Sequence, residues 1–147
     1  MNRNFVEMLD ALSAAGADFL IIGAHAVAAH GHPRSTKDID IWIDPRVDNV
    51  ERVWRALEEF GAPLHQLSRE DLCTPGTIFQ IGIDPVRIDI LTAVEPLTFA
   101  DAWANRAVIE VDGKGFPFLG REDLIRSKRA AGRPHDLRDI EALEQLQ

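Results

Sequence analysis

The sequence has almost no cysteine: Cys73 is the only one among 147 residues. A single thiol cannot close a disulfide within the chain, and it cannot supply the cysteine pairs of a structural zinc site. A chain of this length can bury a hydrophobic core without such cross-links. We therefore expect a protein of a reducing compartment, the cytoplasm.

Long apolar runs are missing as well. No stretch approaches the roughly 20 apolar residues of a membrane-spanning helix, and the opening residues MNRNFVEMLD lack the apolar segment of a signal peptide. The chain also contains no internal repeat, low-complexity tract or linker. These absences predict no membrane partner and one minimal domain over residues 1–147.

Basic residues are fewer than acidic ones. The 16 Lys and Arg face 24 Asp and Glu, which gives a formal net charge of −8. Such a chain repels polyanions, so binding along extended duplex nucleic acid is not expected. Residues 121–133, REDLIRSKRAAGR, are the exception, because five of their side chains are basic and two are acidic. A local site for a small anion is compatible with this segment.

Hydrophobic spacing predicts the secondary structure. Helices are expected at 4–15, 24–30, 48–61, 98–106, 121–131 and 135–146. Strands are expected at 18–22, 38–43, 77–83, 86–91, 107–111 and 115–119, with turns at Asp84-Pro85 and at DGKG. Asp48 and Thr98 are the expected N-caps of their helices. The order of elements predicts an α/β or α+β fold in which a mixed sheet carries helices and a helical pair ends the chain.

Two aspartates lie on one face of the strand predicted at 38–43. In the run DIDIWI, Asp38 and Asp40 alternate with isoleucines, so their Cα atoms lie about 6.6 Å apart and their side chains point the same way. If the strand at 86–91 pairs beside it, Asp89 joins them, with no fixed cation expected nearby to neutralise all three. Carboxylates this close require a counter-ion. Mg²⁺ prefers oxygen ligands, and two ions about 3.5–4 Å apart serve phosphoryl or nucleotidyl transfer.

A place for phosphates lies just before these aspartates in the chain. Gly23, between a predicted strand and helix, lets the backbone approach a ligand closely. The amides of Ala24 and His25 open that helix as an anion-binding terminus. The loop that leads to the aspartates adds cationic and hydroxyl donors: Arg34, Ser35, Thr36 and Lys37. Phosphate donors and carboxylates are therefore close in sequence.

Together, IIGAHAVAAHGHPRSTKDIDIWID and the later RIDIL resemble the nucleotidyltransferase superfamily with the DNA polymerase β-like fold. The similarity is greatest to small prokaryotic members of the GG-x-A…HG-x-x-R-x-T-x-D-x-D type, a subgroup often described as uncharacterised or toxin-like. The segment DLIRSKRAAGRPHDLRDIEAL is similar to that subgroup's C-terminal Lys…Ala-x-x-Arg…Asp pattern. The resemblance thus covers most of the chain.

The resemblance implies roles for individual residues. The glycine turn at Gly23 would hold the triphosphate, Asp38 and Asp40 would bind two Mg²⁺ ions, or Mn²⁺ in their place, and Asp89 would complete the metal site. The family's second small residue, Gly or Ser, is Ala24 here, which leaves only a backbone contribution to phosphate binding. The implied nucleotide-binding set is Gly23, Ala24, Arg34, Ser35, Thr36 and Lys128.

Structural interpretations of these residues stay open beside the functional ones. Asp89 could instead pair with Arg87 or cap a turn, and Arg34 could be a solvated loop cation. Lys128 could be an ordinary surface charge whose stem covers the core.

Histidines and the C-terminal charges have structural interpretations too. His25 and His30 are five residues apart, outside the i, i+4 spacing of two zinc ligands on a helix, and with His32 they do not predict a zinc site. His30 is expected at a helix C-terminus. Arg133, Asp136 and Asp139 are expected to form a structural set, with Asp136 at the start of the last helix and Arg133 paired with a carboxylate.

The expected function is Mg²⁺-dependent transfer of a nucleoside monophosphate from an NTP to an acceptor hydroxyl, with release of pyrophosphate. The acceptor could be a protein, a small molecule or an RNA end. Two other functions are compatible with the same residues: a catalytically degenerate nucleotide-binding or toxin–antitoxin interaction module, and a Mg²⁺-dependent phosphohydrolase or nuclease. An antitoxin or a second copy of the chain is a further compatible partner.

Overall fold

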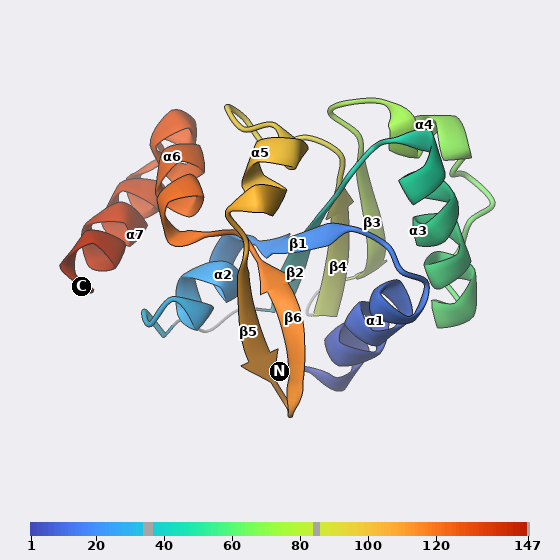
Figure 1. The fold of residues 1–147 in the computed structure, drawn as a ribbon, viewed down its shortest axis with the longest axis horizontal. Helices are drawn as coiled ribbons and strands as arrows, with labels where there is room; N and C mark the ends of the chain where they lie inside the picture. The colour runs from blue at the N-terminus through green and yellow to red at the C-terminus, as the bar shows by residue number, and fades with distance from the viewer. Residues whose placement is uncertain (34–36, 84–85, 147) are drawn as a thin grey trace.

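The computed structural model describes residues 1–33, 37–83 and 86–146. Its centre is a six-stranded sheet in the order β3-β4-β2-β1-β6-β5 (Figure 1). The strands are β1 (Phe19–Ile22), β2 (Asp38–Ile43), β3 (Ile78–Ile83), β4 (Val86–Leu91), β5 (Ala107–Val111) and β6 (Lys114–Phe118). The helices are α1 (Arg3–Ala14), α2 (Gly23–Ala29), α3 (Val47–Phe60), α4 (Arg69–Cys73), α5 (Phe99–Ala104), α6 (Arg121–Ala131) and α7 (Pro134–Gln145).

The sheet is mixed, as the order of predicted elements indicated. β2 pairs with β1 in antiparallel and with β4 in parallel orientation. β3 and β4 form one antiparallel hairpin, β5 and β6 form another, and β6 runs parallel to β1. The predicted α/β fold with a mixed sheet and a C-terminal helical pair is confirmed.

The two faces of β2 differ in character. Ile39, Ile41 and Ile43 are fully buried, and because side chains alternate along a strand, Asp38 and Asp40 point to the opposite face. α1 packs on α3, and α6 packs on α7. In Figure 1 the first pair lies on one side of the molecule and the second pair on the other. The alternation of side chains along β2 therefore places the aspartates on the sheet face opposite the buried isoleucines.

Helix starts and short elements are where the structure differs from the prediction. α3 begins at Val47 with Arg46 as its N-cap, so Asp48 lies in the first turn and the predicted cap is wrong. The reason is Asp44, whose Oδ1 accepts a hydrogen bond of 3.2 Å from the Arg46 backbone N–H. This bond forms the turn that precedes the helix, so the helix begins before Asp48. Thr98 does stand at the N-cap of α5, although its side chain makes no capping hydrogen bond.

α4 is an element that hydrophobic spacing did not predict. Its five residues are too few to show a helical period. A reciprocal capping box defines its start: Ser68 Oγ accepts the Asp71 N–H at 3.1 Å, and Asp71 Oδ2 accepts the Ser68 N–H at 2.9 Å. None of the helices in the described part of the chain is long and apolar enough to span a membrane.

The second hairpin shows how local chemistry sets an element boundary. Asp112 and Gly113 both have positive φ angles, 51° and 82°, as a two-residue type I′ turn requires. β6 therefore begins at Lys114, one residue before the predicted start.

Candidate active site

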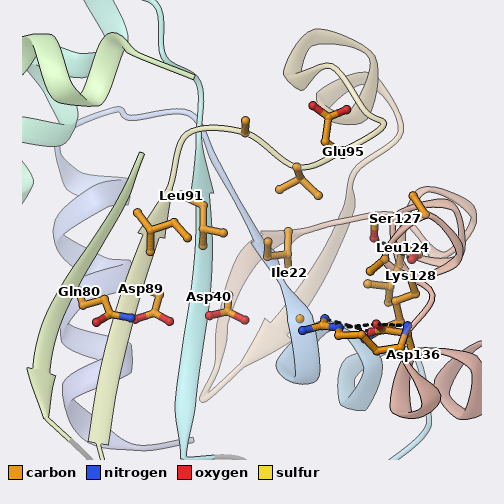
Figure 2. A pocket seen from close by; sticks show the side chains of 17 residues that line it. Ile22, Asp40, Gln80, Asp89, Leu91, Glu95, Leu124, Ser127, Lys128 and Asp136 are labelled. Atoms are coloured by element: carbon orange, nitrogen blue, oxygen red, sulfur yellow. Dashed lines mark hydrogen bonds and ion pairs between the residues drawn. The ribbon is translucent and has the colours of Figure 1, made fainter. Parts of the chain in front are cut away.

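Strand pairing brings the three predicted acidic residues onto one sheet face. β2 and β4 are parallel neighbours, and their register sets Asp40 directly beside Asp89 and Asp38 beside Arg87. Figure 2 shows Asp40 and Asp89 side by side, with Gln80 of β3 next in the row. Asp89 is buried, with 8% of its surface exposed, whereas Asp38 and Asp40 are partly exposed. The expected pairing of the strand 86–91 beside the strand 38–43 is therefore found.

The glycine turn lies against the acidic row, which consists of Asp38, Asp40 and Asp89 together. Ile22, the last residue of β1, is the antiparallel partner of Asp40, and the chain turns directly after it into α2 at Gly23. Gly23 has a φ of +68°, and a Cβ atom at this position would lie 2.5 Å from Asp40 Oδ2. Only glycine fits both the backbone angle and the space. The phosphate and carboxylate halves of the predicted site therefore meet at this contact.

We expect Gly23→Ala to lower the predicted nucleotidyl transfer by about a hundredfold or more, because the new methyl group displaces the Asp40 carboxylate and small displacements of a catalytic group cost this much. Loss of the favoured backbone conformation adds a stability cost on the order of 1–3 kcal/mol. Steady-state kinetics and urea unfolding measure the two effects.

Gly61→Ala is the matched control for Gly23→Ala. Gly61 ends α3 with a φ of +87°, yet a Cβ atom there would meet nothing within 4 Å. This variant therefore carries the backbone strain without the contact on Asp40, and its activity should equal that of the wild type. Equal activity of Gly23→Ala and Gly61→Ala would contradict the importance of the contact.

The electrostatics of the acidic row show a surplus of negative charge. The pKa of Asp40 is raised to about 6, first by burial, then by the neighbouring charge of Asp89, by a hydrogen bond between the two carboxyl groups and by the charge of Asp38. The positive charge of Arg87 opposes this rise. One guanidinium does not offset burial and two neighbouring carboxylates, so this row favours the approach of a cation.

Arg87 is a fixed cation beside the aspartates, although its single charge does not neutralise all three, as the sequence led us to expect. Its Nη2 lies 3.2 Å from Asp38 Oδ2, and its Nε donates a hydrogen bond of 2.9 Å to Asp89 Oδ1. The pairing of Asp89 with Arg87, left open from the sequence, is thus present. Within residues 1–33, 37–83 and 86–146, no three or more His, Cys, Asp or Glu side chains are grouped as ligands of one ion. The Arg87 guanidinium joins the carboxylates of Asp38 and Asp89, and the three carboxylates do not point at one common position.

Asp40 and Asp89 line a cleft of about 440 Å³, and Asp38 is not among its lining residues. In Figure 2, Asp89 and Asp40 lie on one side of this cleft, and Lys128, Ser127 and Leu124 of α6 with Asp136 of α7 lie across from them. The side chains of Ile78, Gln80, Leu91, Val94, Glu95 and Ser127 also line it. Sequence reasoning missed these six, since their place depends on the β3–β4 register and on the packing of α6, which no local pattern reveals.

The cleft wall formed by α6 and α7 contains a buried ion cluster. Lys128, 8% exposed, lies with its Nζ 2.9 Å from Asp139 Oδ2 and 3.4 Å from Asp136 Oδ1. Arg133 Nε donates a hydrogen bond of 2.6 Å to Asp136 Oδ2. The predicted structural set of Arg133, Asp136 and Asp139 is confirmed, and Lys128 belongs to it. The interpretation of Lys128 as an ordinary surface charge is wrong, because the two aspartates draw its ammonium group into the interior.

The other predicted nucleotide-binding residues occupy different positions. Ala24 lies partly buried in the first turn of α2, directly after Gly23. Arg34, Ser35 and Thr36 lie outside the described residues. Their predicted roles therefore stay predictions.

Two of the three histidines that follow Gly23 make structural contacts. His25 of α2 meets the ring of Phe5 edge-to-face at 5.5 Å. His30 stands at the C-cap of α2, as expected, and its Nε2 hydrogen bonds with the Leu119 carbonyl oxygen at 2.8 Å. His32 is partly exposed in the loop after α2.

Comparison with known proteins identifies the family. A family model described as "Nucleotidyl transferase of unknown function" matches residues 1–147. The chain belongs to this family. It is therefore a nucleotidyltransferase, and the resemblance drawn from the glycine turn and the paired aspartates is confirmed. No curated protein matches the chain.

Solved structures agree on the fold of this nucleotidyltransferase. A Thermotoga maritima protein assigned as a nucleotidyltransferase is 19% identical, with a TM-score of 0.64, over 99% of this chain and 92% of that one. The lincosamide antibiotic adenylyltransferase LnuA, in its lincomycin-bound form, is 16% identical, with a TM-score of 0.62, over 100% of this chain and 98% of that one. Both have the polymerase β-like fold, and so does this nucleotidyltransferase.

Proposed function

We propose that the nucleotidyltransferase moves a nucleoside monophosphate from an NTP to an acceptor hydroxyl with the help of Mg²⁺. In this reaction the hydroxyl oxygen forms a bond to the α-phosphorus of the NTP. The bond from that phosphorus to the leaving oxygen breaks, and pyrophosphate departs. The observation that carries the proposal is the contact of Gly23 with the Asp40 carboxylate, in register with Asp89.

The chemistry of the three aspartates suits a divalent cation, although their carboxylates are not grouped around one ion in the described residues. The donors are carboxylate oxygens, which Mg²⁺ prefers. The pKa of Asp40, raised first by burial and then by the charges of Asp89 and Asp38, supports a site with surplus negative charge. Asp38, Asp40 and Asp89 would hold the metal. Bound Mg²⁺ would neutralise phosphate charge and orient the reacting oxygens. We assign to Asp89, the most buried of the three, the additional task of accepting the hydroxyl proton.

The chain's other groups position the NTP in this proposal. The backbone at Gly23 can approach the phosphates because glycine has no side chain of its own. Lys128 and Arg133 line the opposite wall of the cleft. Asp136 and Asp139 pair the Lys128 ammonium, so the guanidinium of Arg133 is the group placed to attract the phosphates. Arg133 keeps 63% of its side chain exposed, while Asp136 fixes its guanidinium. This arrangement supports a donor site between the acidic row and the ion cluster.

Thermal unfolding with each of the four NTPs, with and without Mg²⁺, tests the donor site. A ligand at about 100 times its Kd adds about 2.7 kcal/mol to the free energy of unfolding, which raises the Tm of a domain of this size by several degrees. We expect such a rise for at least one NTP, only with Mg²⁺ present. Asp101→Asn, an exposed position on α5, is the control and should shift like the wild type.

Product analysis then separates transfer from hydrolysis. With α-labelled NTP and the candidate acceptors, a protein, a small alcohol and an RNA end, transfer leaves the label on the acceptor and releases pyrophosphate. Free nucleoside monophosphate as the only labelled product would contradict the proposal in favour of a phosphohydrolase. Absence of any Mg²⁺-dependent shift would favour a degenerate site with an interaction role instead.

A further inference from the structure

Arg87 occupies a position within the acidic row that is suited to a cation. Its Nη2 lies 3.2 Å from Asp38 Oδ2 and donates a hydrogen bond of 3.3 Å to Asp89 Oδ2. Its Nε donates a second bond, of 2.9 Å, to Asp89 Oδ1. One guanidinium therefore donates hydrogen bonds from two nitrogens to Asp89 and also forms an ion pair with Asp38 on the neighbouring strand.

The backbone places this guanidinium among the carboxylates. Arg87 and Asp89 are two residues apart on β4 and so share a face, and Asp38 is the direct partner of Arg87 across the β2–β4 pair. About 29% of the Arg87 side chain is exposed. The planar arginine guanidinium binds carboxylates through two fixed nitrogen donors, which gives the contact a geometric specificity that a lysine ammonium lacks. The contact is thus a consequence of register.

The same oxygens are the ones that a divalent ion needs. Asp38 and Asp89 belong to the proposed metal ligands, and a ligand oxygen that accepts hydrogen bonds from Arg87 has fewer lone pairs for a metal. A positive charge a few ångströms from a dication also repels it. Arg87 therefore opposes metal entry both by occupying the donors and by its charge.

We propose that Arg87 is the resident counter-ion of this acidic row and competes with the divalent metal for Asp38 and Asp89. It keeps metal affinity low in the absence of nucleotide. The phosphates of an NTP bring negative charge that offsets the repulsion, so metal and nucleotide bind together more tightly than either binds alone. The inference rests on the proposed function, because it takes the three aspartates as the metal ligands.

Titration with Mn²⁺ tests the competition directly. The electron paramagnetic resonance signal of free aqueous Mn²⁺ gives the bound fraction without any catalytic turnover. We expect Arg87→Gln to bind Mn²⁺ about tenfold or more tightly than the wild type in the absence of nucleotide. With a non-hydrolysable NTP analogue present, the gap between the two proteins should narrow.

Two control variants assign the signal. Arg55→Gln removes the same charge from an exposed position on α3, and its Mn²⁺ affinity should equal that of the wild type. Asp40→Asn removes a proposed ligand and should abolish Mn²⁺ binding in both the wild-type and the Arg87→Gln backgrounds. Binding that survives Asp40→Asn would place the ion elsewhere and overturn the proposal.

Thermal unfolding provides a second readout that covers a poorly folded variant. Without metal, Arg87→Gln leaves carboxylates uncompensated and should lower the Tm, and Mn²⁺ should raise the Tm of this variant more than that of the wild type. If Arg87→Gln folds only when Mn²⁺ is added, the metal has taken the place of the missing guanidinium charge, and the proposal is supported. Arg87→Lys keeps the charge without the fork, and its affinity should lie between those of the wild type and Arg87→Gln.

The outcomes separate this inference from the proposed function. Equal or weaker Mn²⁺ binding by Arg87→Gln overturns the competition, and weaker binding would mean that Arg87 holds the ligands in place. No Mn²⁺ binding by any variant, with or without nucleotide, overturns the metal site itself and this inference with it. Binding by the wild type that Arg87→Gln leaves unchanged overturns only the inference.

Discussion

Replacing Asp40 with asparagine is expected to lower nucleotidyl transfer on the order of a thousandfold and to raise the free energy of unfolding at neutral pH. The two effects have one cause. The Asp40 carboxylate lies in the acidic row beside Asp89 and against Gly23, where its charge would hold the proposed cation and destabilises the protein without one. Asparagine keeps the shape and removes the charge.

The pH dependence of stability follows from the sign of the Asp40 shift. Burial and the charge of Asp89 raise its pKa from 3.8 to about 6, so between these values the folded protein binds the proton more tightly than the unfolded chain does. Stability contributed by this group therefore falls as pH rises from about 4 to about 6. Above that range Asp40→Asn should be the more stable protein by an amount on the order of 2 kcal/mol.

Urea unfolding of both proteins in EDTA, between pH 4 and pH 7.5, measures this difference. The two curves should coincide near pH 4 and separate as pH rises, and added Mg²⁺ with an NTP should stabilise the wild type alone. Lower stability of Asp40→Asn at pH 7.5 would show that Arg87 compensates the ionised carboxylate fully. Retained transfer by the variant would remove Asp40 from the proposed mechanism.

Asp136→Ala is expected to cost about 3 kcal/mol or more of folding stability, since it takes one partner from the buried Lys128 and leaves an incompletely paired charge. Asp136 is fully buried and also accepts the backbone and side-chain N–H groups of Arg133 at the start of α7. Burial alone would raise its pKa, but the hydrogen bonds from Arg133 and the charge of Lys128 lower it. Its ionised form therefore stabilises the fold.

The pH dependence of this residue has the opposite sign to that of Asp40. Because the folded pKa of Asp136 lies below the usual value, its contribution is present above the unfolded pKa and is lost as pH falls through the folded one. The difference between wild type and Asp136→Ala in urea unfolding should therefore be largest at neutral pH and shrink in acid. Glu141→Ala, an exposed position on α7, is the control and should cost less than about 0.5 kcal/mol. A cost that small for Asp136→Ala would contradict the assigned role of the cluster.

Local patterns were sufficient wherever the evidence lies within a few residues. The alternation in DIDIWI predicted β2 and the shared face of Asp38 and Asp40, and apolar spacing predicted α1 and α3. Helix starts were less predictable, because Asp44 takes the turn before α3 that Asp48 was expected to cap. α4 has a clear capping box but too few residues for periodicity to show.

The sequence by itself determined that two aspartates point the same way and that a glycine turn precedes them, because strand alternation and backbone freedom are local properties. Only the tertiary structure decided that Asp89 stands beside Asp40, that Arg87 bridges Asp38 and Asp89, and that Lys128 is buried between aspartates of α7. The physical reason is that these contacts join segments far apart in the chain. Strand order, register and the packing of α6 on α7 set them, and no local pattern encodes those choices.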